Sequence, residues 1–138
     1  MVRLHLTDSR IWGALLCLHS SPVSAADRLI CYPKAYSTVQ NDGKLGPAFE
    51  ENTIIKRRYH FDQKSGELTV ITGVHERKDG DYDILEKGGR SNALVAIDHY
   101  EGAARSGVDL LRIDTWKDPM TFQLHQSGAI TSGTCEAK

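Results

Sequence analysis

Between residue 28 and the C-terminus, short runs of β-branched and aromatic residues alternate with clusters of Gly, Asn, Asp and Ser. No window in this stretch keeps a helical repeat of apolar residues for three turns. Short runs bounded by turn-forming residues are typical of strands joined by tight loops. We therefore predict an all-β fold in which strands pair in sequence order as an antiparallel meander. The predicted strands span residues 28–32, 53–61, 67–74, 81–85, 93–100, 108–116, 121–124 and 129–134.

The clearest predicted hairpin joins the strands at 53–61 and 67–74. Its linker ends in Gly66, which suits the left-handed position of a short β loop. A one-residue slip would move every side chain to the opposite face, so the agreement of two apolar faces fixes the register. Counting outward from the loop gives three apolar pairs: Phe61 with Leu68, Tyr59 with Val70, and Ile55 with Val74.

A second hairpin is predicted around Pro119, which pre-sets a turn between the strands at 108–116 and 121–124. Met120, Phe122 and Leu124 alternate with polar residues in the second of these strands. Because side chains in a strand alternate between its two faces, we expect these three to share the apolar face.

Residues 33–52 form the longest predicted loop of the chain. A loop this long without structure of its own is uncommon in a compact domain unless it has a function. Pro47 to Glu51 can form one helical turn with proline at its first position. We take Lys44 and Phe49 as candidate binding residues, on the hypothesis that this loop contacts a partner. The alternative is a loop packed over an open barrel end, with Phe49 as its plug.

Residues 1–25 are predicted to be a secretory signal peptide. Arg3 and Arg10 precede the apolar run at 11–18, and Val23-Ser24-Ala25 supplies the small residues of a cleavage site. That run is too short for a bilayer, which needs about 20 apolar residues, so no membrane span is expected in the mature chain. Cleavage leaves residues 26–138 as a single β domain. The alternative is an N-terminal helix packed against a cytosolic domain.

Removal of the leader takes away Cys17 and leaves Cys31 and Cys135 in an oxidising compartment, where we expect them to pair. The bridge would close a loop of about 100 residues, worth at most ~4–5 kcal/mol in the chain-entropy account. It would also bring the first and last strands together, as a closing meander requires. This favours a small barrel over a two-sheet sandwich. Two free thiols acting as a metal or redox pair would be the alternative, but CxxC spacing is missing.

The charge balance argues against nucleic acid as a partner. The full chain has a net charge of −1, and loss of Arg3, Arg10 and Asp8 with the leader makes it slightly more acidic. Proteins that bind phosphate backbones need a concentrated basic face. Two arginines, Arg57 and Arg112, instead interrupt apolar faces. An inward arginine must find a partner, so each is either a paired structural residue at a barrel mouth or an anchor for an anionic ligand.

Signals for catalysis are sparse, since the sequence has neither a nucleophile elbow nor a glycine-rich loop before a helix. An acid/base group would have to draw on His99, Asp98 and Asp114, with Glu101 nearby, and only if their strands are neighbours. We expect His99 to be buried, because it continues the alternation of Ala93, Val95 and Ile97. This small hydrolase or metal-dependent enzyme is the alternative function.

One acidic cluster has the alternation of a cation site. Asp79, Asp81 and Asp83 would point to the same side of a strand, where their oxygens can face a calcium ion. The cluster lacks the glycine and the final acidic ligand of an EF-hand loop. The alternative is an Asp-Gly turn that opens a solvent-facing strand. We expect no cofactor.

The closing Ser132-Gly133-Thr134-Cys135 is similar to the Gly-x-Cys ending of many small secreted proteobacterial proteins. The chain as a whole resembles small bacterial periplasmic barrels, which include inhibitors of lysozymes and of secreted proteases. It has neither the Ser-Gly-x-x-Tyr segment of the lysozyme inhibitors nor the early Gly-x-Trp of lipocalins, so no family is assigned. We expect a secreted or periplasmic, non-enzymatic β-barrel that binds a protein partner, as an inhibitor does, or a small ligand. A structural component of the envelope is a further alternative.

Overall fold

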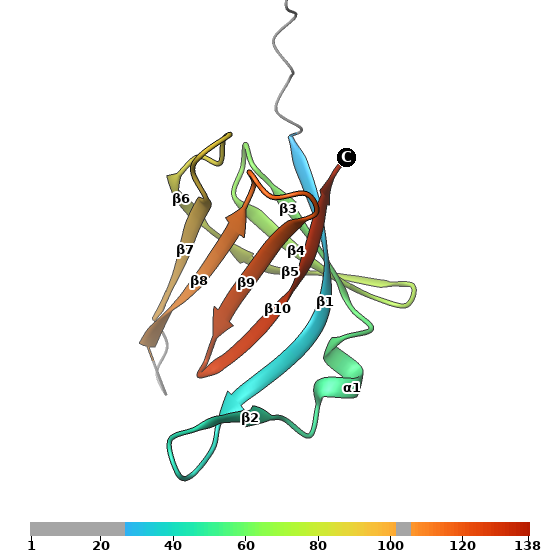
Figure 1. The fold of residues 1–138 in the computed structure, drawn as a ribbon, viewed down its shortest axis with the longest axis vertical. Coiled ribbons are helices and arrows are strands. Elements are labelled where there is room, and N and C mark those ends of the chain that lie inside the picture. Colours follow the sequence, from blue (N-terminus) through green and yellow to red (C-terminus); the bar gives the residue numbers. More distant parts are fainter. Residues whose placement is uncertain (1–26, 102–105) are drawn as a thin grey trace, which may run out of the picture.

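The computed structural model describes residues 27–101 and 106–138, which form ten strands and one short helix (Figure 1). The predicted signal peptide lies outside the described residues. The elements are β1 (Arg28–Val39), β2 (Leu45–Pro47), α1 (Glu51–Ile54), β3 (Arg58–Asp62), β4 (Glu67–Thr72), β5 (His75–Asp81), β6 (Asp83–Glu86), β7 (Leu94–Glu101), β8 (Ser106–Asp114), β9 (Met120–Gln126) and β10 (Ala129–Ala137).

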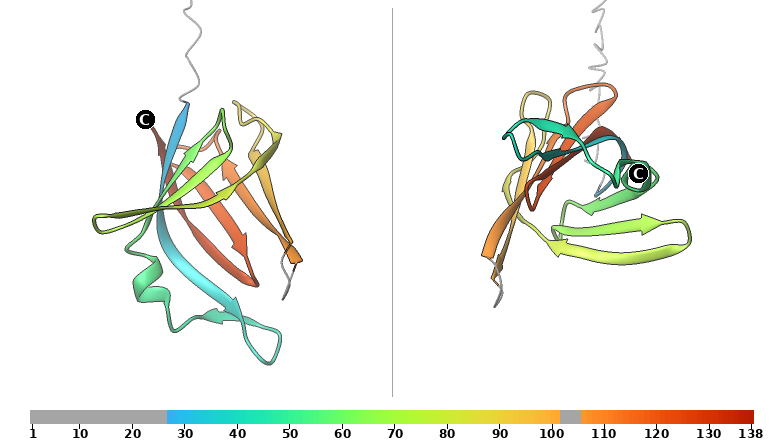
Figure 2. Two further views of the ribbon diagram at one scale, coloured as in Figure 1. Left: turned by 180° about the vertical axis from the view of Figure 1, so that it is seen from behind. Right: turned by 90° about the horizontal axis from the view of Figure 1, so that it is seen from below.

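All ten strands belong to one antiparallel sheet, in the order β5-β4-β3-β1-β10-β9-β8-β7-β6, with β2 added to β1. The two edge strands, β5 and β6, are neighbours in sequence and are separated only by Tyr82. One continuous segment therefore pairs with β4 in its first half and with β7 in its second. The sheet curls until its edges meet at this segment (Figure 2), which confirms the predicted small, nearly closed barrel.

Alternate residues of the strands fill the barrel interior. Two aromatic contacts tie opposite walls together: Tyr59 with Phe122, at 6.1 Å between ring centroids, and Phe61 with Tyr82, at 6.3 Å and nearly perpendicular. Edge-to-face geometry of this kind is favoured for aromatic pairs. The buried core comprises Leu29, Cys31, Tyr59, Phe61, Leu68, Val70, Tyr82, Leu94, Ala96, Leu111, Ile113, Phe122, Leu124 and Cys135.

The predicted pairing of the two cysteines is confirmed in the geometry. Cys31 of β1 and Cys135 of β10 are direct partners in the antiparallel ladder, with their Cα atoms 4.0 Å apart and their sulfurs bonded. Both side chains point into the core. The bridge spans a sequence separation of 104 residues, so it holds the first and last strands of the barrel side by side.

The register of the first hairpin is confirmed for Phe61 with Leu68 and for Tyr59 with Val70, and Gly66 has the predicted left-handed φ of +76°. The third pair is wrong. Ile55 lies in the turn after α1, because backbone hydrogen bonds bend the chain just before β3. Val74 lies in the tight turn between β4 and β5, where it is 94% exposed.

The predicted loop at 33–52 is also wrong, since most of it is ordered secondary structure. β1 continues to Val39, and a bulge between Pro33 and Ala35 absorbs the proline that marked the predicted end of the strand. Proline in a central strand is tolerated beside a bulge, and here Lys34 is the extra residue while Pro33 stays opposite Gly133. β2 then folds back on β1, and α1 covers part of the same strand. Phe49 does not plug a barrel end; its side chain is fully exposed.

β5 was missed by the sequence pattern, which placed a turn at Lys78-Asp79-Gly80. The segment is a strand because it pairs with β4 along its length, with a register shift opposite Leu68 and Thr69. The shift inserts Asp79 as an extra residue and turns its side chain toward the interior. In the ranges 27–101 and 106–138, no helix has the length and apolar character needed to cross a membrane.

Candidate functional site

Residues 37–50, here called the arm, project from one end of the barrel (Figure 1). The arm consists of the last residues of β1, the strand β2, which pairs with β1 alone, and the linker to α1. Its tip is a tight turn in which Gln40 N–H donates to the Lys44 carbonyl and Lys44 N–H donates to Asp42 Oδ1. These hydrogen bonds hold the turn at the tip, and the base of the arm pairs with β10.

The arm exposes apolar side chains to solvent. Val39 and Leu45 are each 57% exposed and lie opposite one another in the β1–β2 ladder, while Phe49 is fully exposed. A groove of about 270 Å³ runs beside Val39 and Leu45, and Val108 and Ile130 form part of its lining. Single exposed apolar residues are ordinary, but an apolar cluster beside a groove is typical of an interaction site.

Of the two predicted binding residues here, Lys44 is exposed at the arm tip, with its ammonium 3.8 Å from Asp42. Phe49 is fully exposed, which fits a residue that contacts a partner and does not fit a plug of the barrel end. The predicted segment was thus misassigned in structure, while its exposed side chains remain candidates for binding.

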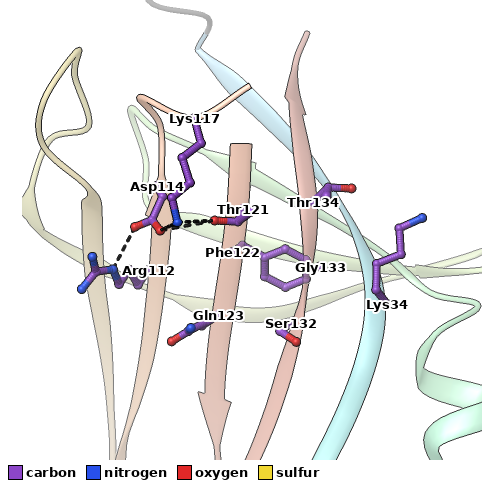
Figure 3. Close-up of a pocket in the computed structure, with 10 residues that line it drawn as sticks. All are labelled: Lys34, Arg112, Asp114, Lys117, Thr121, Phe122, Gln123, Ser132, Gly133 and Thr134. Atoms are coloured by element: carbon purple, nitrogen blue, oxygen red, sulfur yellow. Dashed lines mark hydrogen bonds and ion pairs between the residues drawn. The ribbon is translucent and has the colours of Figure 1, made fainter. Parts of the chain in front are cut away.

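A second feature lies on the outer face of β8, β9, β10 and β1, and we call it the outer trough (Figure 3). Its volume is about 340 Å³. Short polar side chains form its floor on the two central strands, because Thr121 pairs with Thr134, and Gln123 with Ser132. Between these pairs, Phe122 and Gly133 contribute only their backbone to this face, because their positions face the interior, where Phe122 belongs to the core. Longer side chains border it on both sides: Arg112 and Lys117 on one, Lys34 on the other.

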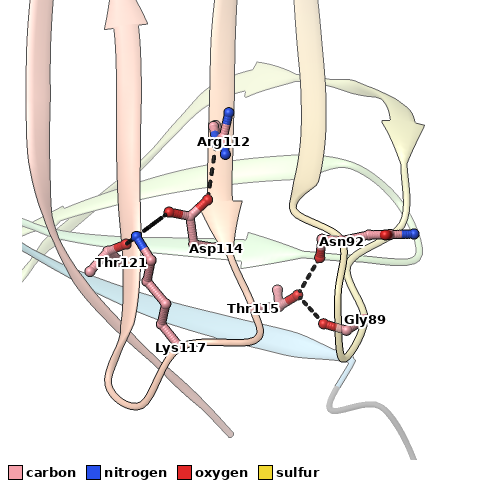
Figure 4. A network of polar contacts seen from close by, with 7 residues as sticks. All are labelled: Gly89, Asn92, Arg112, Asp114, Thr115, Lys117 and Thr121. Carbon is pink, nitrogen blue, oxygen red and sulfur yellow. Dashed lines mark hydrogen bonds and ion pairs between the residues drawn. The ribbon is translucent and has the colours of Figure 1, made fainter.

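Asp114 organises the first of these borders (Figure 4). Its carboxylate accepts a hydrogen bond from Arg112 Nε at 3.0 Å and one from Lys117 Nζ at 2.7 Å. The hydroxyl of Thr121 donates to the same carboxylate at 3.3 Å. The Lys117 and Arg112 contacts lower the pKa of Asp114, so the carboxylate stays ionised and keeps both cations in place.

The nearby end of the barrel is fastened by a second set of bonds. Thr115 Oγ1 donates to the carbonyl oxygens of Gly89 and Asn92, each at 3.0 Å (Figure 4). These bonds connect the end of β8 to the loop between β6 and β7. They therefore hold the end of β8, which carries Arg112 and Asp114, against this loop.

Inside the barrel, at the end that carries the arm, three aspartates come together: Asp79 of β5, Asp98 of β7 and Asp109 of β8. Gln126 Nε2 donates to Asp79 Oδ2 at 2.8 Å and to Asp109 Oδ2 at 3.3 Å. Burial raises the pKa of Asp98 and of Asp109, and the neighbouring carboxylates raise them further. This polar cluster closes the interior below the apolar core.

The predicted catalytic residues are not brought together. Asp98 and His99 follow one another in β7 and so face opposite sides, and His99 is exposed rather than buried, because Leu94 and Ala96 are the inward residues. Asp98 pairs with Asp109, and Asp114 lies five residues further along β8, roughly 17 Å away at strand spacing. Glu101, at the end of β7, is exposed.

The predicted cation ligands also separate. Asp79 turns inward at the bulge, where Arg77 pairs with it at 3.0 Å, while Asp81 and Asp83 are exposed. Lys78 pairs with Asp81 at 2.7 Å. Among the residues that the structure describes, no group of three His, Cys, Asp or Glu side chains is arranged to hold a metal ion.

The two arginines have different surroundings. Arg57 is half-buried just before β3, near the Tyr59 hydroxyl, and its Nε has no hydrogen-bond partner in the described part of the chain. Arg112 points outward, because the inward positions of β8 belong to Leu111 and Ile113. The sequence predicted Arg112 on an apolar face at a barrel mouth; the observed alternation places it on the polar outer face instead.

Several residues of these sites were not singled out by the sequence. Lys34 reaches the outer trough because the β1 bulge makes it an extra residue, and neither the bulge nor the neighbouring strand has a local signal. Gln126 and Asp109 meet through the β8–β9 hairpin, whose register could have indicated their proximity.

Comparison with protein-family models, with curated proteins and with solved structures finds no match to this chain.

Proposed function

We propose that this protein is a secreted or periplasmic binding protein with no catalytic role, and that its arm holds another protein in the manner of a small inhibitor. The observation that carries the proposal is the complete exposure of Phe49 on the same arm that exposes two aliphatic residues, Val39 and Leu45. Aromatic anchors that fill a pocket on a partner dominate the energy of many protein interfaces. The groove beside the arm offers a reciprocal place for a partner's side chain.

We take the partner bound by the arm to be a different protein. The described chain enters at the opposite end of β1 from the arm (Figure 1). β2 pairs with β1 from Ser37 onward, nine residues after Arg28, so about 30 Å of strand separates that point from β2. The predicted cleavage after Ala25 would in any case remove the leader.

The other expected functions receive less support. Side chains fill the barrel interior, so a ligand enclosed by the barrel has no evident space. The enzyme alternative relied on Asp98, His99 and Asp114 meeting in one cleft, and they face different sides of the sheet. An envelope component would be favoured by a long apolar open strand edge, whereas the edge strands β5 and β6 have seven and four residues and β5 is mostly charged and exposed.

The test compares Phe49→Ser with Val74→Ser, which removes an equally exposed apolar side chain from the β4–β5 turn. A partner is first captured by the mature protein from periplasmic extract and identified by mass spectrometry, and its affinity for each variant is then measured with purified components. We expect Phe49→Ser to weaken binding at least tenfold, which corresponds to about 1.4 kcal/mol. Val74→Ser should stay within twofold of the wild type.

Neither substitution should change stability by more than about 0.5 kcal/mol, because both side chains lie in solvent. Unfolding curves check this before binding is compared. Equal affinities of the two variants for the captured partner would contradict a role for the arm.

A further inference from the structure

We infer that the outer trough is a second binding site, independent of the arm, for a small molecule that carries two anionic groups, phosphate or carboxylate, one at each end. Its volume of about 340 Å³ is at the small end of the range for small-molecule sites. Small-molecule sites are concave and carry a few polar groups in fixed positions, and the trough has both properties.

Arg112 and Lys117 form the first anion position. Arg112 uses only its Nε to hold Asp114, so its two terminal nitrogens have no hydrogen-bond partner among the described residues. A guanidinium presents those nitrogens as a planar fork that matches a phosphate or a carboxylate. Lys117 is fixed beside it through the other oxygen of Asp114. With two cations and one carboxylate, this end keeps a net positive charge.

Lys34 forms the second anion position, across the sheet. It is exposed and makes no ion pair with any residue in the described ranges. The bulge in β1 makes Lys34 an extra residue of the strand and leaves it at the border of the trough (Figure 3). Three strand spacings separate β8 from β1, or roughly 14 Å, and the flexible side chains can lean inward from both sides. A ligand with its charges at the two ends of a chain of about six atoms would therefore reach both positions.

The floor between the two positions is suited to the middle of such a ligand. Ser132 and Thr134 present hydroxyl groups that have no hydrogen-bond partner in the parts of the chain described, and Gln123 presents an amide. A hydroxylated linker between the two anionic groups would find hydrogen-bond partners here, whereas a bulky apolar one would not.

Isothermal titration calorimetry at low ionic strength tests this with two probes: fructose 1,6-bisphosphate, which has a phosphate at each end of a six-carbon chain, and inorganic phosphate, which can fill only one position. We expect the bisphosphate to bind at least tenfold more tightly than phosphate. Lys34→Ala should remove that advantage and leave phosphate binding unchanged. Arg112→Ala should weaken both probes at least tenfold.

Lys56→Ala is the matched control, because Lys56 is exposed and lies outside the trough. It should leave both affinities within twofold of the wild type. Equal affinity for the two probes would overturn the inference, and so would an equal loss in Lys34→Ala and Lys56→Ala, which would indicate nonspecific attraction of anions. Phe49→Ser should bind the bisphosphate normally, so failure of the arm proposal leaves this test unaffected.

Discussion

Asp109 and Asp114 stand on opposite faces of β8 and have opposite electrostatic surroundings. Asp109 points into the barrel, where burial raises its pKa and its Oδ1 has no hydrogen-bond partner in the described residues. Asp114 points outward, where Lys117 and Arg112 lower its pKa. A raised pKa means that the folded state disfavours the carboxylate, and a lowered pKa means that it favours the carboxylate.

The substitution Asp109→Asn should therefore stabilise the protein near pH 7. A group with a raised folded pKa supports folding below its ordinary pKa of about 3.9, and this support is lost as the pH rises through the folded value. Asparagine removes the charge and can still accept a hydrogen bond from Gln126. We expect a higher free energy of unfolding than that of the wild type at pH 7 and little difference near pH 3, measured by urea denaturation at both pH values.

Asp114→Asn serves as the opposite-sign control. Its carboxylate supports folding above the ordinary pKa, and this support is lost as the pH falls through the lowered folded value. We expect the variant to lose up to about 1 kcal/mol at pH 7, the usual scale for exposed ion pairs, and less at pH 3, with the loss vanishing only below the lowered folded pKa. If both asparagine variants shift stability in the same direction at pH 7, the assigned environments are incorrect.

At the scale of elements, the barrel closes where the β3–β4 turn meets the segment that joins β5 to β6. Gly66 in that turn is buried, and its carbonyl accepts a hydrogen bond from Tyr82 N–H at 2.8 Å. A Cβ on Gly66 would collide with the Tyr82 carbonyl oxygen. Gly73, in the β4–β5 turn, shares the left-handed backbone, with φ +61°, but has open space around it.

Comparing the stability of Gly66→Ala with that of Gly73→Ala should therefore separate the cost of the left-handed backbone from the cost of the collision with Tyr82. Both pay about 1–2 kcal/mol for the left-handed conformation. We expect Gly66→Ala to lose at least about 2 kcal/mol more, because its Cβ pushes apart the strands that close the barrel. Thermal and urea unfolding of both variants measure the difference. Equal losses would show that Gly66 is not a closing contact.

The elements that the sequence predicted well are those with local signals on both sides of a turn. The hairpin around Gly66 has matching apolar faces, so its register could be counted. β5 lacks such a face: its residues are mostly charged and exposed, and it becomes a strand only through pairing with β4. The extension of β1 past Pro33 likewise depends on β10 and on a bulge, which are tertiary effects.

At the scale of the whole molecule, two connections define the barrel. The Cys31–Cys135 disulfide joins β1 to β10, and Tyr82 is the single residue that links the edge strands β5 and β6. The pattern of short apolar runs between turn residues and the positions of the cysteines were enough to predict the all-β class, the barrel and the bridge. They were insufficient for the sites, because the outer trough and the aspartate cluster each combine side chains from strands far apart in sequence.

The proposed binding role depends on export and on a bridge that forms in an oxidising compartment. The most direct test is the intact mass of the protein recovered from the periplasm in the presence of iodoacetamide, with and without prior reduction. The account predicts one species that begins at Ala26 and takes up iodoacetamide only after reduction, at Cys31 and Cys135. A species that retains residues 1–25, or that is alkylated at both cysteines without reduction, would contradict it.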